Sequence, residues 1–138
     1  MHAKQFLSQL QDQKEDINHI KSKITLLREV AAISSPLLDG LPHSLNSGND
    51  PVTSTACAIA DLEEQLYDLQ KLYETTLQTI TKIILSLEEP LAQEVCIRRY
   101  LQGSSWKEIS TDLSYSRSTI MRIHKEALSS VQQMLDAS

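Results

Sequence analysis

The sequence predicts an all-α protein in which a long antiparallel helical hairpin, residues 1–89, precedes a domain of three short helices, residues 90–138. The composition includes only three glycines and four prolines and is rich in residues that favour helix over sheet. Two long stretches repeat apolar residues in alternating steps of three and four, as a helix packed along one side does. After Pro90 the repeats shorten and acquire start and stop signals of their own.

The first apolar stripe predicts one long amphipathic helix near the N-terminus. Ser34-Ser35-Pro36 is expected to end this helix, because proline lacks an N–H donor and clashes with the preceding turn. The following segment, 34–50, contains two glycines and a second proline and is predicted to be a loop, unusually long for a helix connection. The stripe consists of Phe6, Leu10, Gln13, Ile17, Ile20, Ile24, Leu27 and Ala31.

The second stripe predicts another long helix, which ends at about Leu87. Asp50 suits the N-cap and Pro51 suits the first helical position, where the missing N–H has no intrahelical partner in any case. Glu88-Glu89-Pro90 interrupts the pattern. The stripe consists of Ile59, Leu62, Leu66, Leu69, Tyr73, Thr76, Ile80, Ile83 and Leu87.

The two stripes fit each other when the chain folds back at the loop. Positions whose numbers sum to 89 or 90 then pair, so that Gln13 falls opposite Thr76. These two residues are the single polar interruptions of their stripes, and a buried polar layer can set the register of paired helices. We therefore expect an antiparallel coiled-coil hairpin. The same stripes could instead pair between chains as a homodimer or higher oligomer, and the sequence is compatible with both arrangements.

The segment after Pro90 begins with two short helices. The first covers about 91–101 and is closed by Gln102-Gly103, a glycine stop. The second opens with a capping box, in which Ser105 is the N-cap and Glu108 follows three residues later. It is expected to bury Trp106, Ile109 and Leu113.

A third, longer helix follows after a tight turn at Ser114-Tyr115. Ser116 is its expected N-cap, and the helix covers 117 to about 135. Two short helices joined by a tight turn, with the second longer and carrying basic residues, are typical of a helix-turn-helix DNA-binding domain. The apolar face of the third helix is Ile120, Ile123, Ala127, Val131 and Leu135.

The opposite face of this helix contains the candidate DNA-binding residues. Its early positions lie where recognition-helix side chains reach base edges in the major groove. Arg117 and Lys125 are better placed for phosphates, and exposed N–H groups near the N-cap add a phosphate site. His124 counts here among the basic-type residues of the helix, whereas Arg98-Arg99 fits a phosphate contact and a plain surface role equally well. The candidates are Ser116, Arg117, Ser118, Met121, Arg122 and Lys125.

The net charge of −5 is unevenly distributed along the chain. Residues 1–89 contain 7 Lys and Arg against 13 Asp and Glu, whereas residues 90–138 contain 6 against 5. The acidic excess therefore lies in the front part, and the back part, with a net charge of +1, is free to approach DNA.

A family resemblance rests on residues 87–131, LEEPLAQEVCIRRYLQGSSWKEISTDLSYSRSTIMRIHKEALSSV. This stretch resembles region four of bacterial sigma factors, the part that reads the −35 promoter element. It is more similar still to the region-four-like domain of ArpU- and RinA-type late-transcription regulators in phages of Gram-positive bacteria. Ser118 and Thr119 occupy positions where region four often has Glu and further Arg. We therefore do not expect this chain to prefer the −35 consensus sequence. Nothing resembles the sigma region that melts the −10 element.

These observations predict a sequence-specific transcription regulator, a phage or prophage late-gene activator that binds double-stranded DNA and contacts RNA polymerase in the bacterial cytoplasm. A protein-interaction module that mimics region four and docks on polymerase without reading bases is the alternative. A phage packaging protein is a third, disfavoured because the helix-turn-helix lies at the back of the chain. Phosphate-binding glycine loops, paired catalytic acids, metal-ligand spacing and a bilayer-spanning run are not found, so we expect neither an enzyme, a cofactor nor a membrane anchor.

Overall fold

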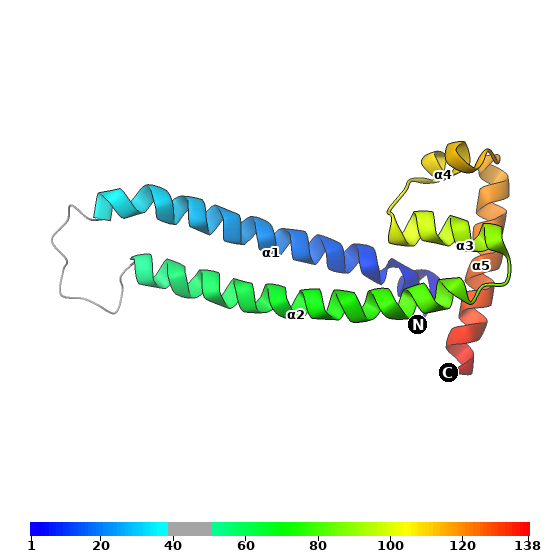
Figure 1. The fold of residues 1–138 in the computed structure, drawn as a ribbon, viewed down its shortest axis with the longest axis horizontal. Helices are drawn as coiled ribbons and strands as arrows, with labels where there is room; N and C mark the ends of the chain where they lie inside the picture. The colour runs from blue at the N-terminus through cyan, green and yellow to red at the C-terminus, as the bar shows by residue number, and fades with distance from the viewer. Residues whose placement is uncertain (39–50) are drawn as a thin grey trace. The chain divides into compact units, whose positions relative to one another are not determined.

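The computed structural model describes residues 1–38 and 51–138, and all regular secondary structure in these residues is helical (Figure 1). This confirms the predicted all-α class. None of the described helices is long and apolar enough to cross a membrane. The elements in chain order are α1 (Ala3–Leu38), α2 (Pro51–Leu85), α3 (Pro90–Cys96), the π-helical turn η2 (Ile97–Leu101), α4 (Trp106–Leu113) and α5 (Arg117–Ala137).

The chain forms two compact units, and both long helices contribute to each of them. The first unit consists of Met1–Lys14 and Tyr73–Ser138, and the second unit is Glu15–Leu72. The boundary that the sequence suggests at residue 90 therefore falls inside the first unit. The first unit takes in both the start of α1 and the end of α2 because these segments are buried against the short helices.

In the second unit, the later part of α1 packs along the beginning of α2. Ile17, Ile20 and Ile24 of the first stripe are buried, and Arg28 forms an ion pair with Glu63 across the two helices. By sequence this unit contains 4 Lys and Arg against 9 Asp and Glu, so the whole net charge of −5 belongs to it.

In the first unit, a polar contact fixes the register of the two long helices. The Gln13 side-chain amide donates to Thr76 Oγ1 over 3.1 Å, as the pairing of the two polar interruptions predicts. Thr76 is buried, and Gln13 Oε1 is buried without a hydrogen-bond partner among the described residues. The predicted register is confirmed here.

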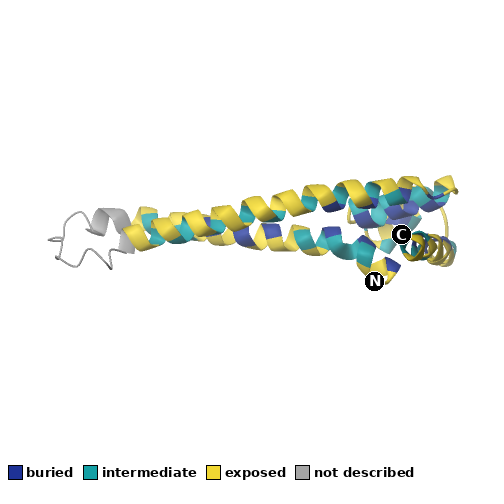
Figure 2. Ribbon diagram, turned by 90° about the horizontal axis from the view of Figure 1, so that it is seen from below, coloured by how far each residue is buried: buried dark blue, intermediate teal, exposed yellow. Residues whose placement is uncertain are grey.

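The core of the first unit joins the ends of the long helices to the short ones. Figure 2 shows how the buried residues gather in this part of the chain. Leu7 of α1 and Ile84 of α2 are fully buried, although neither belongs to a predicted stripe. They lie in one core cluster with residues of the short helices. The largest fully buried side chains are Leu7, Leu10, Ile80, Ile84, Val95, Cys96, Ile109, Ile120 and Val131.

Two expected helix boundaries need correction. α1 continues past Pro36 to Leu38, because a proline near a helix end removes one hydrogen bond without preventing the last residues from keeping helical dihedrals. The remainder of the expected loop, 39–50, and the expected N-cap Asp50 lie outside the described residues, but α2 does begin at Pro51. α2 ends at Leu85, two residues earlier than predicted.

The helix expected over 91–101 changes type in its last turn. α3 ends at Cys96, and η2 follows with an i→i−5 hydrogen bond from the Gln102 N–H to the Ile97 carbonyl, 3.0 Å. The wider turn places Tyr100 in the core, and Gly103 ends the segment with φ +74° as the predicted glycine stop requires. A 3.6-residue period in the sequence does not reveal one extra residue in a turn.

We expect the Gln13–Thr76 pair to respond asymmetrically to substitution. Thr76→Val alone leaves the half-buried Gln13 amide without its acceptor and lowers the free energy of unfolding by about 1–2 kcal/mol. Adding Gln13→Leu removes the stranded polar group and restores most of that stability. Urea denaturation of the two single variants and the double variant measures the coupling; a double variant no more stable than Thr76→Val contradicts this account.

Candidate nucleic-acid interface

The turn between α4 and α5 has the geometry of a helix-turn-helix. α4 begins at the predicted N-cap, where Ser105 Oγ accepts from the Glu108 N–H over 3.1 Å. It ends at Leu113, and the capping residue Ser114 has left-handed dihedrals, φ 60° and ψ 37°. The N–H groups of Ser114 and Tyr115 donate back to the carbonyls of Thr111 and Ser110, the two bonds of a Schellman motif. The serine adopts the conformation that glycine usually takes at this position.

α5 begins and packs as the sequence predicts. Ser116 Oγ accepts from the Thr119 N–H over 3.3 Å, so Ser116 is the N-cap. The side chains that hold the helix on the core occupy the predicted face, with Leu135 half-buried at its end. The fully or nearly fully buried members of this face are Ile120, Ile123, Ala127 and Val131.

The six candidate DNA-binding residues all lie on the solvent side of this helix or at its start. Met121 is 39% exposed, although it is the one large apolar residue of the set. An uncovered apolar side chain beside polar and basic ones suits contact with a thymine methyl group. The exposed set is Ser116, Arg117, Ser118, Met121, Arg122 and Lys125.

Arg122 has an acidic neighbour that sequence reasoning did not single out. Its guanidinium Nη1 lies 3.3 Å from Glu126 Oε1, one turn further along α5. Both side chains are well exposed, 65% and 60%, so the pair contributes little to stability and opens easily. The i,i+4 spacing of Arg and Glu was the signal that could have revealed this contact.

His124 belongs to the core and not to the basic face of α5, which corrects the sequence-based grouping. It is 5% exposed, its Nε2 shares a 2.5 Å hydrogen bond with the Tyr100 hydroxyl, and the Trp106 ring meets it edge-on at 4.5 Å between centroids. Burial, together with the positive charges of Lys4 and Arg99, lowers the pKa of His124 from 6.5 to about 4. The imidazole is therefore neutral at pH 7. It connects α5 to η2 through Tyr100 and to α4 through Trp106.

Arg98 and Arg99 both make contacts inside the first unit. Arg98 forms ion pairs with Glu94, 3.0 Å, and Asp112, 3.2 Å, which tie η2 to α4. The Arg99 guanidinium lies 4.5 Å from the centre of the Trp106 ring and donates to the Ser104 carbonyl. These contacts give both arginines a structural role, which differs from the phosphate contact and the plain surface role that the sequence left open.

Residues 89–133 match the family described as Sigma-70, region 4. Because this segment comprises α3, η2, α4 and most of α5, the C-terminal helices form a helix-turn-helix of the sigma region-four type. Domains of this class bind DNA and serve transcription, and they are regulatory rather than catalytic. Searches among curated proteins and among solved structures found no match to the chain.

The remaining described side chains offer no metal centre. Among the residues whose side chains the structure describes, no group of three or more His, Cys, Asp or Glu is arranged to hold a metal ion.

Glycine in place of Ser114, the left-handed residue of the turn, should make the protein more stable. Replacing Ser114 by glycine removes the Cβ strain of a positive φ, and we expect the free energy of unfolding to rise by about 1 kcal/mol. The same change at Ser129, exposed in the middle of α5, should instead lower it by roughly 0.5 kcal/mol. Thermal or urea unfolding distinguishes the two variants; equal effects of Ser114→Gly and Ser129→Gly would show that the turn is unstrained.

The stability of the first unit should depend on pH through His124. The unfolded chain takes up a proton at this residue as the pH falls below 6.5, whereas the folded chain resists protonation until about pH 4. Stability is therefore lost between these values as the pH falls, by about 1.4 kcal/mol per pH unit at most.

Unfolding curves at several pH values measure this slope. His124→Asn, which does not titrate, is less stable at neutral pH, and its stability should fall less steeply than that of the natural chain. Parallel slopes for the two proteins would assign the pH dependence to other groups.

Proposed function

We propose that this protein is a sequence-specific DNA-binding transcription regulator, a phage or prophage late-gene activator of the ArpU or RinA type, which reads DNA with α5. The observation that carries the proposal is the exposed face of α5 at the start of the helix, in a segment that matches Sigma-70 region 4. A capped helix that exposes a basic face along its N-terminal half is suited to enter the major groove.

In this proposal one group of side chains contacts base edges and a second group contacts phosphates. Ser118, Met121 and Arg122 face outward near the start of α5 and contact base edges, with the arginine directed to guanine. Arg117, Lys125 and the free N–H groups that follow Ser116 contact phosphates and set the position of the helix on the duplex.

The small reading surface makes a second contact necessary. The first unit contains 9 Lys and Arg against 9 Asp and Glu, so it gains little from general attraction to DNA. We propose that a second copy or RNA polymerase supplies the missing affinity. The second unit, with its net charge of −5, is suited to protein contacts and unsuited to DNA.

One observation favours a second candidate function. The pairing of Arg122 with Glu126 and the balanced charge of the first unit suit a region-four mimic that docks on polymerase without reading bases. The two functions differ in what happens when the reading face loses its charges, because only the first requires Arg117, Arg122 and Lys125.

Binding to DNA from the upstream region of the protein's own gene tests the proposal. We expect affinity to fall with salt, and Arg122→Ala to reduce the preference over random DNA by about 1–3 kcal/mol. Arg117→Ala should weaken binding to all sequences alike and lower the salt slope by about 1. Fluorescence anisotropy over a series of salt concentrations measures both quantities.

Arg28→Ala is the matched control, since Arg28 is equally exposed, at 62%, but lies in the second unit. It should leave DNA binding unchanged. Equal binding to the upstream fragment and to random DNA at moderate salt would falsify base reading. Retention of RNA polymerase by a chain that lacks Arg117, Arg122 and Lys125 would then favour the docking function.

A further inference from the structure

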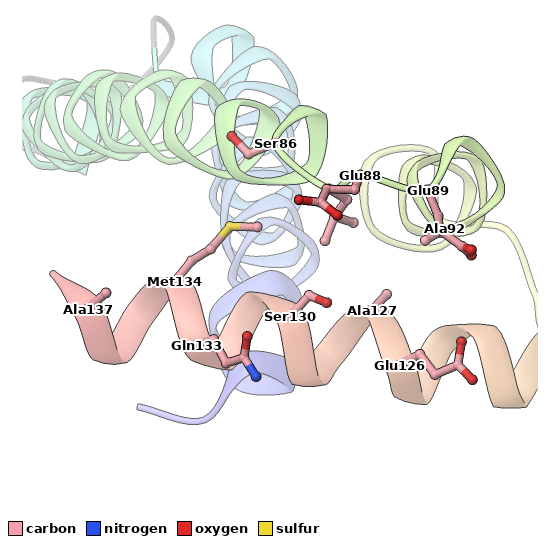
Figure 3. A pocket seen from close by; sticks show the side chains of 11 residues that line it. Ser86, Glu88, Glu89, Ala92, Glu126, Ala127, Ser130, Gln133, Met134 and Ala137 are labelled. Atoms are coloured by element: carbon pink, nitrogen blue, oxygen red, sulfur yellow. The ribbon is translucent and has the colours of Figure 1, made fainter.

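Large apolar side chains are exposed on the second unit. In the groove of the first unit between the α2–α3 junction and α5, the apolar lining residues Leu87, Ala92 and Ala127 are themselves buried (Figure 3). In the described part of the second unit, by contrast, five large apolar side chains are between 46% and 71% exposed. They are Leu26, Val30, Ile33, Tyr67 and Leu72. The second unit therefore leaves apolar surface in contact with water.

Four of these five residues lie on one face of the hairpin, opposite an ion pair. Arg28 and Glu63 each follow a position of the two apolar stripes by one residue, and their ion pair marks the first face. Val30 and Leu72 each precede a stripe position by one residue, which in an antiparallel pair of helices places them on the opposite face. Helical spacing puts two more exposed residues of α1 beside Val30, at i−4 and i+3. This apolar face consists of Leu26, Val30, Ile33 and Leu72.

The core beneath the apolar face is incompletely covered. Among the described residues of the second unit, only Ile17, Ile20 and Ile24 are buried. A pair of helices shields its stripes from one side only, whereas a four-helix bundle encloses them. The opposing stripe of α2 is accordingly half-buried, at Ile59, Leu62, Leu66 and Leu69. A second layer of helices over the apolar face would complete this core.

The two helices of this unit carry opposite charge. Residues 17–33 of α1 contain three Lys and Arg against one acid, and residues 58–68 of α2 contain four acids and no base. When two identical faces stack about a two-fold axis along the hairpins, α1 of each copy lies over α2 of the other. The basic segment then meets the acidic segment twice, which is a complementary contact. We propose that the second unit dimerises through its apolar face, with two hairpins pointing the same way in a four-helix bundle.

The register of the hairpin predicts the contacts across this dimer. α1 and the partner's α2 run antiparallel and meet at the heights at which α1 meets its own α2. Lys23, which precedes a stripe position as Val30 does, then lies between the partner's Asp61 and the partner's Asp68. Val30 lies against the partner's Ala58, whose small side chain lets the helices approach closely.

A face of this size holds a weak dimer. Residues 15–33 rise about 28 Å at 1.5 Å per residue, and two adjacent helices are about 20 Å wide, so the face covers roughly 550 Å². Stable complexes of standard size bury about 800 Å² on each partner. We therefore expect a dissociation constant on the order of 10 μM. The dimer deepens the proposed function by making a second copy the partner; its role on DNA rests on that function, whereas dimerisation does not.

Sedimentation equilibrium of the full-length protein over roughly 1–100 μM tests the dimer. Leu26→Glu puts a charge into the apolar face and should raise the dissociation constant by at least about ten-fold. The matched control is Tyr67→Glu, since Tyr67 is equally exposed, 59% against 58%, but lies on the face of the ion pair. Circular dichroism checks that both variants are folded. A protein that stays monomeric over the whole range, or equal effects of the two variants, overturns the proposal.

Charge reversal tests which helices meet. Lys23→Glu places like charges beside the partner's Asp61 and the partner's Asp68 and should raise the dissociation constant by roughly three- to ten-fold. Adding Asp68→Lys should restore most of the affinity, because the exchanged pair forms in both halves of the interface. A folded double variant that dimerises no better than Lys23→Glu overturns the contact of α1 with the partner's α2, and the proposal with it.

DNA binding has its own readout. Leu26→Glu should weaken binding to the upstream fragment by about ten-fold, because a second copy no longer adds its contacts, whereas Tyr67→Glu should not. A dimer that binds no DNA contradicts the proposed function and leaves the dimer standing. DNA binding by a protein that never dimerises contradicts only the dimer.

Discussion

The structure depends on the burial of the two long-helix ends inside the helix-turn-helix unit. Leu7 and Leu10 of α1 and Ile80 and Ile84 of α2 are in one core with the inward face of α5. Polar contacts fix the same interface, since the Ala3 N–H donates to Gln132 Oε1 over 2.8 Å. A domain of three short helices has little apolar area of its own, so these ends supply much of the core that holds α5 in place.

A buried polar cluster adds specificity to this packing. Tyr100, Trp106 and His124 come from η2, α4 and α5, and they meet through one hydrogen bond, one stacked ring contact and one edge-on ring contact. The neutral imidazole satisfies the tyrosine hydroxyl, which would otherwise be buried without a partner. The angle between α4 and α5 is thus set by directional contacts as well as by apolar packing, and that angle decides how far the reading face projects.

The helix caps and the register of the long helices could be predicted from sequence, because residues close in sequence or an obvious break in a repeat determine them. Ser105 and Ser116 cap their helices because a short side chain can reach the third N–H, and Gln13 meets Thr76 because two polar residues interrupt otherwise apolar stripes. The features that could not be predicted depend on contacts distant in sequence. Leu7 is buried although it does not belong to the predicted apolar stripe of α1. His124 resembles a basic surface residue in the sequence, but in the structure η2 and α4 cover it. The candidate reading face was predicted from the helical wheel, but its acidic neighbour Glu126 was overlooked.

Glu126 illustrates how charge near a reading face can favour selectivity over strength. In the proposed function, the Glu126 carboxylate repels phosphates and competes for the Arg122 guanidinium, so it weakens every DNA complex alike. Because the ion pair is exposed and opens easily, a guanine that offers two acceptors can replace the carboxylate as the partner of Arg122. The net charge of zero in the first unit acts in the same direction. In the proposed function, a protein built in this way holds DNA firmly only when a second contact is made.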